Sequence, residues 1–158
     1  MISKAEKEIL IETPYFLPGH VLRKLLCEAA QRGVNVNVVT PIHSDVHVVD
    51  IIRRHYLGSL HQAGVKLHFY TAGNLHAKGV MIDNEIFSIS SANFDYRSFR
   101  YQYELALIGK EPQLLPQLQE HFDSTLKYCT SFDYVSWKRR STIDRIIELM
   151  LLPFRYLF

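Results

Sequence analysis

The pattern of residues 76–90 restricts the fold more than any other stretch of this 158-residue chain. Side chains alternate from 76 to 82 with the period of a β-strand, and a second strand-like run follows at 85–90. Asn84 lies between the two runs, where asparagine favours a tight turn. The stretch therefore predicts an antiparallel hairpin that points His76 and Lys78 to one face and returns Ser91 and Asn93 beside them.

Strand and helix patterns alternate on both sides of this hairpin. The predicted strands cover 8–13, 34–39, 65–70 and 102–108, and the predicted helices cover 21–31, 46–63, 111–128 and 135–152. This interleaving predicts an α/β fold in which one mixed β-sheet is flanked by helices on both faces. No internal repeat is present. We divide the chain into a catalytic half-domain at 1–134 and a C-terminal amphipathic helix with a tail at 135–158.

Composition limits the classes of partner. Hydrophobic residues make up 47% of the chain, enough for a globular core, and the formal net charge of +2 gives no reason to expect nucleic acid as a ligand. No apolar run reaches the roughly eighteen residues of a membrane span, so the chain itself is not expected to cross a bilayer. Cys27 and Cys129 lack C-x-x-C spacing and are read as reduced thiols, which favours a cytoplasmic location.

The polar side chains of the predicted hairpin suit chemistry at a phosphodiester. A neutral imidazole such as His76 attacks phosphorus when an acceptor holds its other nitrogen protonated, so a carboxylate is expected nearby. Lys78 and the Asn93 amide are donors for phosphoryl oxygens, and Ser91 is a further donor. No His, Cys and carboxylate cluster has metal-ligand spacing, so we predict no metal and no cofactor. The alternative is a hairpin that carries these groups for structural reasons.

The motif H-x-K-x4-D at 76–83, followed by S-x-N at 91–93, resembles the signature of the phospholipase D superfamily. Flanking segments narrow the resemblance to the C-terminal half of bacterial cardiolipin synthases; they are 11–16, 32–34, 44–45, 63–65, 75–78 and 91–99. The resemblance implies a single phospholipase D-like domain that transfers a phosphatidyl group through a phosphohistidine. Two positions depart from the family pattern, because Ser90 replaces a glycine and Gln102 replaces an asparagine.

The resemblance also implies roles for individual residues. His76 is the nucleophile, Lys78 and Asn93 hold phosphate oxygens, Glu104 orients the imidazole, and Asp83 is structural although it belongs to the motif. The full predicted catalytic set is His76, Lys78, Asp83, Ser91, Asn93 and Glu104. The predicted substrate-binding set is Tyr15, Phe16 and Arg97. Tyr15 and Phe16 either line a lipid or glycerol pocket or pack in the core, and Arg97 either contacts phosphate or pairs with Asp95.

One motif is half of what this chemistry needs, because the departing alkoxide requires a proton that the superfamily supplies from a second, related histidine. We expect the second half-site from a homodimer partner or from a missing N-terminal half, and we interpret the chain as a truncated piece. The expected substrate is a phospholipid resembling phosphatidylglycerol. A homodimeric single-motif phosphodiesterase or nuclease, and an inactive half-domain, remain alternatives.

The C-terminal segment has the pattern of a basic amphipathic helix. Trp137, Lys138, Arg139 and Arg140 precede apolar residues at helical spacing, with charged residues opposite them. Such a helix packs on the domain, on a partner or on an anionic membrane surface. We therefore expect a protein bound peripherally at the cytoplasmic face of a membrane.

Overall fold

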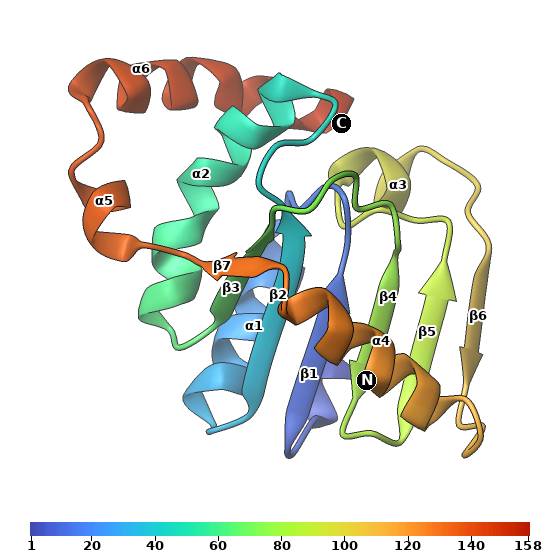
Figure 1. Cartoon of the computed structure of the whole chain (residues 1–158). Helices are drawn as coiled ribbons and strands as arrows, with labels where there is room; N and C mark the ends of the chain where they lie inside the picture. The colour runs from blue at the N-terminus through green and yellow to red at the C-terminus, as the bar shows by residue number, and fades with distance from the viewer.

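Seven strands form one mixed β-sheet in the computed structural model, which describes residues 1–158 (Figure 1). The strands are β1 (Glu8–Glu12), β2 (Asn35–Pro41), β3 (Lys66–Tyr70), β4 (Gly79–Ile82), β5 (Ile86–Ser90), β6 (Ala106–Gly109) and β7 (Cys129–Ser131). Their order across the sheet is β6-β5-β4-β1-β2-β3-β7. β1, β2 and β3 are parallel, and the other neighbouring pairs are antiparallel. The expected mixed sheet is confirmed.

Helices cover both faces of this sheet, as the interleaved pattern predicted. They are α1 (His20–Gln31), α2 (His47–Gln62), α3 (Tyr96–Arg100), α4 (Leu115–Leu126), α5 (Tyr134–Lys138) and α6 (Thr142–Leu151), with 3-10 turns η1 (Ile2–Lys4) and η2 (Leu152–Leu157). α1 and α2 are the crossovers between parallel strands. Each ends before a glycine with positive φ, Gly33 at 94° and Gly64 at 98°, a conformation that suits glycine at a helix end.

The core lies in two layers, one on each side of the sheet. The larger cluster joins alternate residues of β1 and β2, such as Ile9 and Val36, to buried residues of α1 and α2. The smaller cluster joins the opposite face, including Met81 and Phe87, to Phe122 of α4. The alternation of side chains along each strand supplies both layers. No helix in the structure has the length and apolar character needed to span a bilayer.

The predicted hairpin is present, but its first strand is shorter than expected. β4 pairs with β5, and Asp83 and Asn84 have positive φ of 56° and 54° between them, so the tight turn is confirmed. The Glu85 N–H donates to the Ile82 carbonyl at 3.0 Å and closes the turn. β4 begins only at Gly79, however, so His76 and Lys78 precede the strand. The prediction that they share a strand face is wrong.

Other element boundaries also differ from the pattern. The strand expected at 102–108 begins at 106, and the helix expected at 111–128 is confined to α4, with β7 following on the edge of the sheet. The helix expected at 135–152 is two helices, because Ser141 and Asp144 form a capping box that starts α6 anew. The five-residue α3 is too short to show a helical period. The C-terminal helices α5 and α6 pack against α2.

Candidate active site

Most of the candidate residues come together at the end of the sheet where β1 and β2 finish and β4 begins. The Tyr15 hydroxyl, after β1, donates to the Asp45 carboxylate, after β2, at 2.5 Å. A cavity of about 150 Å3 at this end is lined by Pro14, Asp45 and His76 among others. Parallel strands deliver their following loops to one edge, so segments far apart in sequence meet there.

His76 and Lys78 lie in the irregular segment that leads into β4. His76 is exposed, and the Lys78 ammonium donates to the His76 carbonyl oxygen at 2.8 Å. Partial burial lowers the pKa of Lys78, while the negative charges of Glu104, Asp45 and Asp95 act in the opposite direction. The ammonium therefore sits among carboxylates at the sheet end, where it is available to pair with a phosphoryl oxygen.

Glu104 is held by two side chains from the same network. The Ser91 hydroxyl donates a short hydrogen bond to the Glu104 carboxylate. With the Gln102 amide oriented to satisfy both neighbours, its nitrogen donates to Glu104 at 3.1 Å and its oxygen accepts from the Arg97 Nε at 3.1 Å. No hydrogen bond joins Glu104 to His76, so the role of Glu104 as the imidazole's acceptor stays a prediction. Gln102, noted only as a departure from the family pattern, thus links Arg97 to Glu104.

The backbone around Asn93 is fixed, while its side-chain oxygen has no partner. The Asn93 N–H donates to the Ser98 hydroxyl at 3.1 Å, and the Ser98 N–H donates to the Asp95 carboxylate, which caps α3, at 2.7 Å. The next residue, Phe94, donates its N–H to the Thr13 hydroxyl at 3.2 Å. The buried Asn93 Oδ1 is unbonded. Asn93 is thus fixed through its backbone while its side-chain amide lacks a partner, which leaves the amide able to turn towards a ligand.

Asp83 holds the hairpin to β1 and does not face the end of the sheet where His76 and Lys78 lie. Its carboxylate accepts from the N–H groups of Glu6 at 3.0 Å, Lys7 at 2.7 Å and Glu8 at 2.9 Å. Partial burial alone would raise the pKa of Asp83, but these three backbone donors outweigh it and lower the pKa below its usual value. The contacts agree with a structural role.

We expect Asp83→Asn to lower the free energy of unfolding by about 1 to 2 kcal/mol at neutral pH, because charge-assisted hydrogen bonds become neutral ones. The lowered pKa means that this stabilisation is complete above the ordinary carboxyl pKa and is lost as pH falls through the folded-state value. Urea unfolding across the acid range measures the difference. Glu85→Gln, an exposed carboxylate of the same turn, is the control. Equal stability of the Asp83 and Glu85 variants at neutral pH would contradict the assignment.

The three predicted substrate-binding residues have different surroundings. Tyr15 is half-buried, and burial together with its hydrogen bond to Asp45 raises the pKa of its hydroxyl to about 12. Phe16 is fully buried in the larger core cluster and bridges to Phe94, so it supports the loop from beneath and does not line an open pocket. Arg97 is exposed and reaches Gln102, whereas Asp95 caps α3, so these two do not pair.

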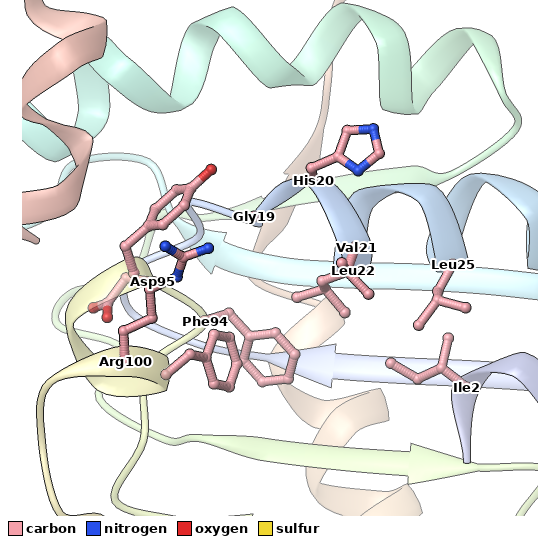
Figure 2. Close-up of a pocket in the computed structure, with 11 residues that line it drawn as sticks. Ile2, Gly19, His20, Val21, Leu22, Leu25, Phe94, Asp95 and Arg100 are labelled. Atoms are coloured by element: carbon pink, nitrogen blue, oxygen red, sulfur yellow. The ribbon is translucent and has the colours of Figure 1, made fainter.

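An apolar cavity lies beside the Asn93 loop and was not predicted. Its volume is about 500 Å3, and Figure 2 shows Leu22 and Leu25 of α1 and Phe94 facing a common space, with Arg100 near them. Leu22 and Leu25 belong to an apolar stripe of α1, and both line the cavity. Val21, in the same stripe, is 71% exposed, so part of this face is open to a ligand. No group of three or more His, Cys, Asp and Glu side chains is arranged to hold a metal ion.

The arrangement of sheet, hairpin and loops is that of phospholipase D-like domains. The phospholipase D family member Nuc from Salmonella typhimurium aligns with a TM-score of 0.70 at 21% identity, covering 83% of this chain and 85% of that one. A phosphatidylserine synthase from Haemophilus influenzae aligns with a TM-score of 0.75 at 15% identity, covering 98% of this chain and 40% of that one. At such identities these likenesses show the shared fold alone.

Sequence comparison identifies the family. A family model described as cardiolipin synthase, PLD-like domain, matches residues 1–126, and the chain belongs to this family. A cardiolipin synthase of Clostridium perfringens (strain SM101 / Type A) is 36% identical over 151 residues, 96% of this chain and 32% of its own length. The major cardiolipin synthase of Bacillus subtilis (strain 168) is 35% identical over 148 residues, 94% of this chain and 31% of its own. The chain thus spans about a third of the curated relatives it matches.

Proposed function

We propose that this chain supplies one half of a phosphatidyltransferase site of the cardiolipin synthase type. The observation that carries the proposal is the gathering of His76, Lys78, Asn93 and the Ser91–Glu104 pair around one end of the sheet, in a chain of this family. The relatives named above are cardiolipin synthases. The class of substrate that this name implies is phospholipid.

The proposed reaction has two displacements at phosphorus. The neutral His76 imidazole attacks the phosphate of a phosphatidylglycerol-like lipid, a phosphorus–nitrogen bond forms, and the glycerol alkoxide leaves after taking a proton. Lys78 and the Asn93 amide stabilise the charge on the non-bridging oxygens. The hydroxyl of a second lipid then gives up its proton and attacks the phosphohistidine, which restores the imidazole. In this scheme Glu104 orients His76 through its other ring nitrogen.

A second half-site is needed because the alkoxide must be protonated, and residues 1–158 contain one H-x-K motif of this kind. Beside Glu104 the chain exposes the large side chains of Tyr101, Tyr103 and Leu105, an apolar rim of the kind that protein partners cover. We propose that a second motif-bearing half, from a second copy of this chain or from another part of a longer enzyme, covers this rim. Its histidine would then serve as the general acid.

Lipid as the substrate is supported by the apolar cavity next to Asn93. Its volume of about 500 Å3 and its lining of aliphatic and aromatic side chains suit part of an acyl chain, with Arg100 near it for an anionic group. Tyr15 and Arg97, at the polar end of the sheet, are the proposed contacts for the headgroup. Such a substrate resides in membranes, and we propose peripheral action at the cytoplasmic face.

The test is product analysis with phosphatidylglycerol vesicles after separation of oligomers by size. We expect cardiolipin and free glycerol in equal amounts, and we expect activity in the dimer fraction if the isolated chain is active, since two copies meeting about a twofold axis complete the site. Phosphatidate in place of cardiolipin would indicate hydrolysis and overturn the transferase assignment. Full turnover by a monomer would overturn the need for a second half.

A homodimeric single-motif phosphodiesterase or nuclease is the second candidate. The structural alignment covers 85% of the Nuc chain. A phospholipase D family member can therefore consist of little more than one domain with this fold. Cleavage of DNA, with binding that weakens steeply as salt rises, together with no lipid product, would favour it. Absence of both activities in every oligomeric fraction would favour an inactive half-domain.

A further inference from the structure

The C-terminal helix α6 turns its apolar side away from the domain. The one buried residue of α6 is the charged Glu148, which is 1% exposed. The outward stripe follows helical spacing and continues into η2; its members, all at least 40% exposed, are Ile143, Ile146, Ile147, Met150 and Phe154. Helices of globular domains usually bury such a stripe, so an exposed one marks a surface that meets something else.

Contacts with the domain hold α6 in this orientation. The Arg140 guanidinium donates to both Glu148 carboxylate oxygens, at 2.8 and 3.0 Å, and lies 3.9 Å from the centre of the Trp137 ring. Trp137 packs over Gly58 of α2 so closely that a Cβ there would be 2.0 Å from the ring. Its indole N–H donates to the Arg54 carbonyl at 2.9 Å. Turning the stripe inward would leave a buried carboxylate without its partner, so the outward orientation is stable.

The exposed charges next to the start of the stripe are basic. Between 138 and 158 the acidic residues are Asp144 and Glu148, and both are used internally, in the α6 capping box and in the pair with Arg140. Lys138 and Arg139, just before α6, are exposed, whereas Arg145 lies on the side of α6 opposite the stripe. An apolar stripe with exposed cations at one end matches the interface of an anionic bilayer, where hydrocarbon lies beneath negative headgroups.

This surface is connected to the candidate active site. The Phe158 carbonyl accepts from the Arg97 N–H of α3 at 2.7 Å, and the rings of Tyr96 and Tyr156 lie 4.9 Å apart edge to face. α3 begins three residues after Asn93. Figure 1 shows α6, the C-terminus and α3 at the same end of the sheet. A bilayer bound to α6 would therefore lie near the catalytic end.

We propose that the outward face of α6 and η2 docks on anionic phospholipid bilayers and brings the catalytic end of the sheet to the lipid headgroups. The role of this docking in bringing the site to its substrate rests on the proposed function. Membrane binding by α6 and η2 does not require turnover. A second protein surface would cover the apolar stripe, yet it would leave the neighbouring basic residues Lys138 and Arg139 without a role. The bilayer accounts for both.

Binding to phosphatidylcholine vesicles, with and without phosphatidylglycerol, is the test, measured by flotation of the whole chain carrying His76→Ala to prevent turnover. We expect Ile146→Ser with Met150→Ser to weaken binding about 30-fold, because two apolar side chains no longer enter the bilayer. Lys138→Gln with Arg139→Gln should weaken it about 10-fold and reduce the preference for phosphatidylglycerol. Leu107→Ser with Ile108→Ser, exposed on edge strand β6, is the matched control and should bind normally.

Three outcomes would overturn the docking proposal. One is unchanged vesicle binding by the Ile146/Met150 variant and by a separate Phe154→Ser variant. Another is equal loss of binding in the β6 control. A third is a change of oligomeric state in the α6 variants with vesicle binding intact, which would make the face a protein interface. Vesicle binding through α6 by a wild-type chain that forms no cardiolipin, even as a dimer or when supplied with its complementary half, would instead contradict the proposed function alone.

Discussion

His76→Ala should abolish the acid-labile, alkali-stable phosphate that the wild-type chain acquires from phosphatidylglycerol labelled in its phosphate. The label stays on the protein because attack by the imidazole retains the phosphatidyl group and releases glycerol. We expect labelling and transfer to fall by about 10³- to 10⁴-fold, as is usual when a covalent nucleophile is removed. Lys78 and Asn93 are proposed to bind phosphate oxygens and do not form this bond.

The control for this experiment is His47→Ala, an exposed histidine at the start of α2 whose side chain makes no hydrogen bond. It should label as the wild type does. Because the second half-site protonates the leaving group, labelling is measured on the dimer fraction or on the chain supplied with its complementary half. Wild-type labelling of the His76 variant would remove His76 as the nucleophile and, with it, the proposed mechanism.

Glu104→Gln should lower kcat by about 100-fold or more, because an amide does not hold an imidazole for attack as a carboxylate does. The substitution keeps the shape of the side chain and its contact with the Ser91 hydroxyl, so the fold should remain intact. A positioning residue acts on the reacting step and not on lipid binding, so KM should change little. Steady-state kinetics with phosphatidylglycerol and thermal unfolding measure these quantities.

Glu120→Gln, on the exposed side of α4, is the matched control and should leave both kinetic constants unchanged. An unchanged kcat in Glu104→Gln would exclude Glu104 from the site. A rise in KM with kcat preserved would instead assign Glu104 to lipid binding through its contacts with Ser91 and Gln102.

Local pattern was sufficient for the order of the main elements and for the identity of the reactive groups. Alternation over residues 76–90 predicted the hairpin, and Asn84 predicted its turn, because these signals depend on near neighbours in sequence. The predicted ends of strands and helices were less accurate where a contact with a distant part of the chain sets the boundary. β4 begins at Gly79 because that is where its pairing with β1 begins, through Glu12, and no feature of 76–78 reports this.

The partners of site residues also depended on tertiary contacts. Asp83 belongs to the motif by spacing. Its carboxylate, however, accepts hydrogen bonds from backbone N–H groups at the start of β1, more than seventy residues earlier in the chain. Glu104 is predicted to orient His76, and the structure adds Ser91 and Gln102 as its hydrogen-bonding partners, which no local pattern indicates. Phe16 was read as either a pocket residue or a core residue, and its neighbours in the larger core cluster decide for the core.

The amino-acid sequence by itself determined which reactive side chains are present and the mixed α/β order of the elements, because periodicity depends on near neighbours. The spacing of the motif and its flanking segments was sufficient for the resemblance to the family. Only the tertiary structure decided which groups meet and which surfaces stay open. The sequence of α6 shows two faces and does not state which one packs inward. The buried Arg140–Glu148 pair and the fit of Trp137 on Gly58 make that choice, since packing energy depends on partners from distant parts of the chain.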